Sequence, residues 1–81
     1  MNVKVLYFAS ARDFASTSAE TLAVPEGSSL GGLAATIFRL HPALGKLRTS
    51  VKFSINLDVV GADKPLHEGD EVGVLPPVAG G

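Results

Sequence analysis

The chain contains no cysteine among its 81 residues. It therefore cannot form a disulfide, a thiolate metal site or a cysteine nucleophile. Its apolar runs are far shorter than the roughly 20 residues that cross a bilayer, and its start does not resemble a signal peptide. The seven lysine and arginine residues form no dense stripe of the kind that binds nucleic acid. We expect a cytoplasmic protein with neither membrane nor nucleic-acid partners.

The composition that is present is typical of one small folded domain. Hydrophobic residues make up 46% of the chain and charged residues 19%, with a formal net charge of −1. This balance differs from that of disordered chains, and the length allows one modest core.

Hydrophobic periodicity predicts strands at residues 3–9 and 20–24, with a polar connection at 10–18. A turn at 25–29 ends in a serine that can cap a helix beginning near Leu30. The helix has an apolar stripe at i, i+3, i+4, i+7 and i+8 and should end before Pro42. Gly31 and Gly32 lie inside this helix, and each should destabilise it by about 1 kcal/mol relative to alanine. Close packing against another segment is the only explanation that the sequence offers for them.

The second half predicts an irregular connection at 43–50 and a half-buried strand at 51–57, the clearest alternation in the chain. A short strand at 58–60, turns at 61–65 and 68–70, and a last strand at 71–75 follow. The fold class is therefore α+β, a mixed sheet with one main helix packed across it. We expect a domain at residues 1–75 and an extended tail at 76–81.

The tail Pro-Pro-Val-Ala-Gly-Gly is unusual for a chain end. Two prolines favour an extended path of about 3.1 Å per residue, so that Pro76 to Gly81 could reach roughly 19 Å from the domain. The paired glycines lack side chains and could pass through a narrow channel. The carboxylate of Gly81 is inert, but an ATP-using partner could convert it to an acyl-adenylate, and sulfide could then replace AMP to give a thiocarboxylate.

Other candidate sites are weaker. His41 and His67 have no carboxylate cluster at ligand spacing, which favours surface or capping roles over metal binding. The glycine-rich helix start at 27–32 lacks the lysine and spacing of a nucleotide loop. The acidic residues at 58–71 lie in turns, and the serines at 16–29 have no plausible histidine partner for nucleophilic catalysis.

The C-terminal signature, from Pro65-Leu66-His67-Glu68-Gly69-Asp70 to the final Pro-Pro-Val-Ala-Gly-Gly, closely resembles that of molybdopterin synthase small subunits, which are ubiquitin-like sulfur carriers. The opening Val-Leu-Tyr-Phe-Ala followed by Arg12, the Pro-Glu-Gly-Ser-Ser-Leu helix entry and Ser-Ile-Asn at 54–56 extend the resemblance over essentially the whole chain.

The resemblance implies a β-grasp fold and a carrier that is not catalytic alone. An adenylating enzyme of the ubiquitin-activating type would activate Gly81, next to Gly80, with ATP and a sulfur donor protein. The large synthase subunit would hold the catalytic pocket, in a heterotetramer of two small and two large subunits, and pass the sulfur to cyclic pyranopterin monophosphate. No cofactor or metal would be bound by this chain. The partner-binding positions that the resemblance implies are Phe8, Arg12, Leu75, Pro76, Pro77, Val78 and Ala79.

Three alternatives remain open. The same tail chemistry serves sulfur carriers for thiamine thiazole or amino-acid synthesis, although the thiamine carriers are usually shorter and lack the Pro-Pro-Val run. A ubiquitin-like modifier would instead form isopeptide bonds with lysines. A binding module with a chemically idle Gly-Gly end is the third alternative.

Overall fold

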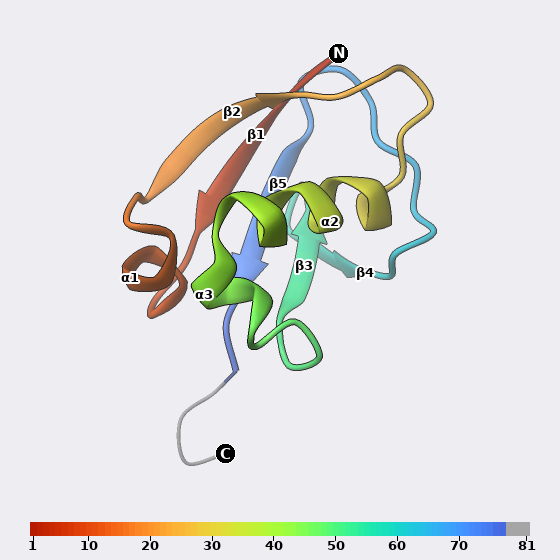
Figure 1. Cartoon of the computed structure of the whole chain (residues 1–81). Coiled ribbons are helices and arrows are strands. Elements are labelled where there is room, and N and C mark those ends of the chain that lie inside the picture. The colour runs from red at the N-terminus through yellow and green to blue at the C-terminus, as the bar shows by residue number, and fades with distance from the viewer. Residues whose placement is uncertain (78–81) are drawn as a thin grey trace.

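The structure is a computed structural model that describes residues 1–77. It has five strands and three helices in the described part of the chain: β1 (Asn2–Tyr7), α1 (Ala11–Ala15), β2 (Ala19–Ala23), α2 (Leu30–Leu40), α3 (Pro42–Gly45), β3 (Lys52–Ile55), β4 (Asp58–Val60) and β5 (Glu71–Leu75). Figure 1 shows α2 lying across the sheet, with α1 and α3 at the end toward which β1 and β5 run.

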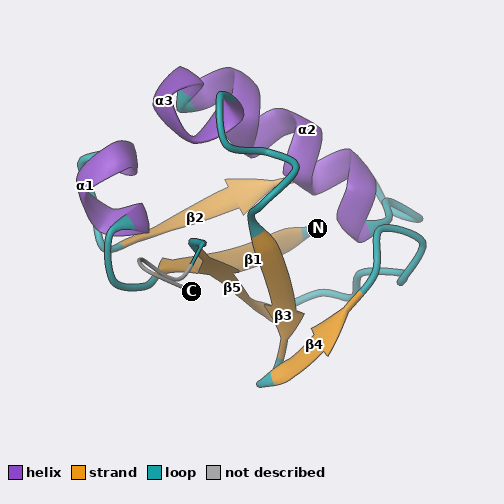
Figure 2. Ribbon diagram, turned by 90° about the horizontal axis from the view of Figure 1, so that it is seen from below, coloured by secondary structure: helices purple, strands orange, loops and turns teal. Residues whose placement is uncertain are grey.

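The five strands form one mixed sheet in the order β2-β1-β5-β3-β4. The central pair β1 and β5 is parallel, and the other neighbours are antiparallel. Figure 2 shows the helices gathered on one side of this sheet. This arrangement confirms the expected α+β fold of the β-grasp type, with a mixed sheet and one main helix.

The core lies between α2 and the sheet face that it covers, which we call the inner face. The fully buried side chains alternate along β1 and β5, as a strand with one covered face requires. From α2, Leu33 and Ile37 are completely buried, and Leu44 of α3 closes the same core. The helical stripe and the strand alternation thus point at one another, as the sequence predicts.

The two glycines of α2 have different explanations. A Cβ on Gly31 would lie 3.1 Å from the carbonyl oxygen of Ala62, to which the Gly31 amide donates a hydrogen bond of 2.8 Å. Close packing therefore explains Gly31. A Cβ on Gly32 would meet only the Ser29 hydroxyl, at 4.0 Å, so the expectation of close packing is wrong there. The Gly32 amide donates to that hydroxyl, which confirms the predicted serine cap.

Two connections are more regular than predicted. The polar segment at 10–18 contains α1, whose Ala11 and Ala15 are buried, and the segment after Pro42 contains the single turn of α3. Both helices are too short to give a convincing 3.6-residue period, and α3 has proline in its first turn, where no amide hydrogen is needed. Pro42 therefore ends α2, as predicted, and also begins α3.

Candidate functional site

The parallel pairing of β1 and β5 brings together the ends of both strands. Tyr7 is opposite Val74 in the register, and the Phe8 amide donates a 3.1 Å hydrogen bond to the Val74 carbonyl. Phe8 therefore lies beside Leu75, although 66 residues separate them in sequence. The tail begins directly after Leu75, so the C-terminal ends of β1 and β5 lie at the root of the tail.

The face of the sheet opposite α2, which we call the outer face, carries the exposed side chain of Phe8. A Cβ on Gly73 would lie 2.8 Å from Cε2 of the Phe8 ring and would also collide with the Ser54 hydroxyl. The ring of Phe8 thus lies across the bare backbone of β5, where only glycine leaves room for it. Phe8 remains 40% exposed, and no described helix covers this face (Figure 2).

The outer face extends beyond the residues that the sequence indicated. Leu6 precedes Phe8 by two residues on β1 and is half-buried, whereas Val59 on β4 is opposite Ser54 in the register and is 64% exposed. Leu6, Val59 and Gly73 were not predicted as site residues. For Leu6 the available signal was alternation, since it lies between the buried Val5 and Tyr7 on β1. For Gly73 it was a glycine between two valines in a strand, which often marks a close approach.

Arg12 lies close to Phe8 because α1 folds back beside the end of β1. Both side chains line a shallow hollow of about 400 Å³, together with residues of the β1–β2 end. Arg12 is exposed, and its Nε approaches the Ala9 carbonyl at 3.5 Å. It forms no ion pair within residues 1–77 and can therefore meet an anionic group from outside.

The structure therefore brings together Phe8, Arg12 and Leu75 as a group at the root of the tail. Pro76 is half-buried and Pro77 is exposed as the chain leaves the sheet. The remaining predicted site residues, Val78, Ala79, Gly80 and Gly81, lie outside the described residues.

A half-buried polar cluster supports the same end of the sheet from the inner side. The Tyr7 hydroxyl donates a hydrogen bond to Glu20 Oε2, and His41 Nε2 lies 2.6 Å from that oxygen. The rings of Tyr7 and His41 meet edge to face at 5.3 Å. The cluster ties β1, β2 and the end of α2 together, so His41 has a carboxylate partner that its isolation in sequence did not predict.

The charges of this cluster follow from burial and hydrogen bonding. Burial, with the hydrogen bond and charge of Glu20, raises the pKa of Tyr7 well above its ordinary value, so Tyr7 stays a donor. Burial acts to raise the pKa of Glu20 as well. The hydrogen bonds from Tyr7 and His41 and the attraction of His41 outweigh it, so the pKa of Glu20 is lowered.

Neither a metal centre nor a membrane segment is found in the part of the chain that the structure describes. Within residues 1–77, no group of three or more histidine, cysteine or acidic side chains could hold a metal ion. No described helix is long and apolar enough to cross a membrane.

Comparison of the sequence with known proteins identifies the family of this chain. The model of the ThiS family matches residues 5–81. The chain belongs to the ThiS family. The molybdopterin synthase sulfur carrier subunit of Escherichia coli is 40% identical over 84 residues, covering 98% of this chain and 99% of the relative. That of Chlamydomonas reinhardtii is 36% identical over 83 residues and covers all of both chains.

Solved structures agree with the family assignment. A putative molybdopterin converting factor subunit 1 from Pyrococcus furiosus superposes with a TM-score of 0.87 at 32% identity, covering 96% of this chain and 99% of that one. At 15% identity, a ubiquitin from Caldiarchaeum subterraneum superposes with a TM-score of 0.68 over all of this chain and 98% of its own, which shows the ubiquitin-like fold alone. A member of this family thus has the β-grasp scaffold expected from its sequence.

Proposed function

We propose that this protein is the sulfur carrier subunit of molybdopterin synthase and acts in molybdenum cofactor biosynthesis. The observation that supports this most is that two features lie together at the C-terminal ends of β1 and β5. An exposed apolar residue, Phe8, is held beside the root of a Pro-Pro-Val-Ala-Gly-Gly tail. Curated relatives with that name match the chain over nearly its whole length.

The proposed chemistry takes place at the carboxylate of Gly81, beside Gly80. An activating enzyme joins this carboxylate to the AMP part of ATP, and pyrophosphate leaves. A sulfide ion (HS⁻) supplied by a donor protein then attacks the acyl carbon and displaces AMP, which leaves a thiocarboxylate at Gly81. In the large subunit the thiocarboxylate sulfur attacks an oxygen-bearing side-chain carbon of cyclic pyranopterin monophosphate and displaces that oxygen. Water then hydrolyses the thioester bond between Gly81 and the sulfur, which restores the carboxylate and leaves the sulfur on the pterin. The chain itself binds no cofactor; ATP is consumed by the activating enzyme.

The proposed partner surface is the outer face around Phe8, Arg12 and Leu75, continued by Pro76 to Ala79 of the tail. An exposed aromatic ring flanked by an arginine is typical of an energetically important contact in a protein interface. One solved structure is a complex of subunits 1 and 2 of a molybdopterin-converting factor from Helicobacter pylori, so those two subunits bind each other. The matching chain of that complex is 23% identical to this one and superposes with a TM-score of 0.72 over the whole of both chains. By analogy, we propose that this chain binds a large subunit. The stoichiometry of two small and two large subunits that the family resemblance implies, and a cytoplasmic location, complete the proposal.

Intact mass spectrometry tests the carrier chemistry directly. After incubation with the activating enzyme, ATP and a sulfur donor, the chain should gain the mass difference between sulfur and oxygen. Deletion of Gly81 should abolish this gain, and so should one extra C-terminal residue. Removal of the extra residue by a carboxypeptidase should restore it. Sulfur loading that persists in the extended variant would contradict the proposal.

Turnover of the pterin precursor separates this proposal from its alternatives. The loaded chain with the large subunit should convert cyclic pyranopterin monophosphate to molybdopterin, and unloaded chain should not. Transfer of sulfur to the thiazole precursor of thiamine instead would favour the other carrier pathway. Conjugates through lysine would favour a modifier.

A further inference from the structure

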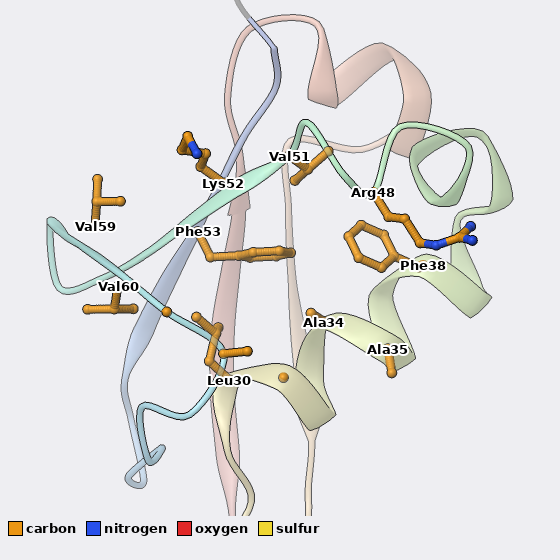
Figure 3. Close-up of a pocket in the computed structure, with 13 residues that line it drawn as sticks. Leu30, Ala34, Ala35, Phe38, Arg48, Val51, Lys52, Phe53, Val59 and Val60 are labelled. Atoms are coloured by element: carbon orange, nitrogen blue, oxygen red, sulfur yellow. The ribbon is translucent and has the colours of Figure 1, made fainter.

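A groove on the inner side of the molecule is not used by the proposed function. It lies between α2 and the β3–β4 edge of the sheet and has a volume of about 490 Å³. Figure 3 shows the rings of Phe38 and Phe53 along its length, with Leu30 and Ala34 below them. The two rings meet edge to face at 5.8 Å. The groove is therefore a mainly apolar channel that is large enough for one big side chain and its neighbours.

The charged residues that line this groove are both basic. Arg48 lies beside Phe38 at one end of the groove, whereas Lys52 borders it from β3 with a side chain that points away from Phe53 (Figure 3), and no aspartate or glutamate contributes to the lining. Neither base forms an ion pair within the described chain, and Arg48 is steadied by a 3.2 Å hydrogen bond from its Nη1 to the Gly45 carbonyl. The nearby carboxylate of Asp63 lies at the opposite end, beside Gly61. The end near Arg48 therefore favours an anionic group.

The groove opens beside the last strand of the sheet. β4 is the final strand in the order β2-β1-β5-β3-β4, and it pairs with β3 on one side. Among residues 1–77, no backbone hydrogen bond joins the other side of β4 to another element. Such an edge is a template on which an extended peptide can add a strand.

The walls of the groove are held in place before any partner binds. The amides of Leu30 and Gly31 donate hydrogen bonds of 2.8 Å to the carbonyls of Lys64 and Ala62, which fasten the segment after β4 to the start of α2. A preformed groove loses little conformational entropy on binding.

We propose that this groove binds an extended, acidic and hydrophobic segment of a partner protein. The segment pairs with the free edge of β4, places one large apolar side chain between α2 and the β3–β4 edge, and sets its carboxylates near Arg48. The outer face and the tail remain free while this segment is bound. The carrier could therefore be held by one protein while its C-terminus is presented to another. The inference is independent of the proposed sulfur chemistry, because it concerns the isolated chain.

Nuclear magnetic resonance titration of the isotope-labelled full chain tests the proposal. The probes are acetyl-Ile-Val-Phe-Asp-Asp-amide and its basic twin acetyl-Ile-Val-Phe-Lys-Lys-amide. The acidic peptide should cause saturable shifts at residues 58–61 and at Ala35 and Phe38. The basic twin should bind about tenfold more weakly, because like charges would meet at Arg48.

Two variants and a matched control locate the site. Ala35→Phe fills the groove from an exposed helical position, and Arg48→Glu reverses the charge at its end; each should weaken the acidic peptide about tenfold. Lys46→Glu makes the same charge change on an exposed residue of the same connection that does not line the groove, and it should have little effect. All three variants should still be loaded with sulfur.

Several results would overturn the inference. Equal binding of the two peptides would exclude the role of charge. Shifts at Leu6 and Gly73 would place the peptide on the outer face. Lack of saturable binding would exclude a peptide site, and so would saturation of the groove by the small anion 8-anilinonaphthalene-1-sulfonate without any binding of the acidic peptide.

Discussion

The two faces of the sheet are built from the same strands and both carry apolar residues, but only the inner face is covered by helices of the described chain. On the inner face Val5, Val72 and Val74 are completely buried beneath α2, whereas on the outer face Phe8 and Val59 are 40% and 64% exposed. Burial of apolar surface stabilises a fold, while an uncovered apolar patch marks an interaction site. The inner face therefore maintains the fold, and the outer face is available to a partner.

The strongest test of this division is a truncation at the inner face. Leu33→Ala removes a completely buried side chain of α2 and should lower the free energy of unfolding by about 3 kcal/mol, through lost burial and a cavity. Leu40→Ala on the same helix removes a 48% exposed side chain and should change it by less than about 0.5 kcal/mol. Urea denaturation measures both, and equal losses would contradict the division.

A smaller loss of stability is expected from a substitution at Gly73 of β5, on whose backbone the Phe8 ring rests. Gly73→Ala should cost about 2 kcal/mol, since the new methyl group collides with the Phe8 ring and the Ser54 hydroxyl. Gly32→Ala is the matched control: its methyl group finds space, and it should stabilise the helix by up to about 1 kcal/mol. Thermal unfolding should therefore show shifts of opposite sign, and a neutral Gly73→Ala would show that Phe8 does not rest on β5.

The polar cluster of Tyr7, Glu20 and His41 should make the stability of the fold depend on pH. The pKa of Glu20 is lower in the folded chain than its ordinary value of 4.5. The contribution of ionised Glu20 to the stability of the fold is therefore complete above pH 4.5 and is lost as the pH falls through the lower pKa of the folded chain. Glu20→Gln should cost about 1 kcal/mol near pH 7, because the hydrogen bonds from Tyr7 and His41 lose their charged acceptor at a partly exposed site.

Stability measured from pH 7 downward should accordingly fall less steeply in Glu20→Gln than in the unaltered chain. Asp13→Asn is a suitable control, since Asp13 is an exposed acid with no hydrogen-bonded partner among the described side chains. Parallel acid profiles for the unaltered chain and Glu20→Gln would show that the cluster contributes nothing.

Sequence periodicity predicted the inner face far better than the site. The stripe of α2 follows from burial, which repeats with the period of the helix, and it was found where expected. Of the strand predicted at 51–57, Val51, Phe53 and Ile55 are buried as expected, but β3 ends at Ile55 and Ser54 is buried as well. Leu57 is 85% exposed, with a positive φ of 78° in the turn before β4, so the prediction of a strand to residue 57 is wrong there.

The contact of Phe8 with Gly73 depends on the parallel register of β1 and β5, which no local pattern encodes. The pairing of Glu20 with His41, 21 residues apart, is non-local in the same way.

The sharpest test of the outer face, with only a small expected effect on stability, is Phe8→Ala. The ring is partly exposed, so its loss should cost about 1 kcal/mol, well below the cost of truncation at Leu33. Affinity for the large subunit should nevertheless fall at least about tenfold, because an aromatic ring beside the tail is typical of residues that dominate binding energy. Calorimetric titration of the two subunits measures this, with Phe14→Ala as control, since Phe14 is 39% exposed but lies on α1. If both truncations weakened binding equally, apolar surface in general would matter, and the outer face would have no special role.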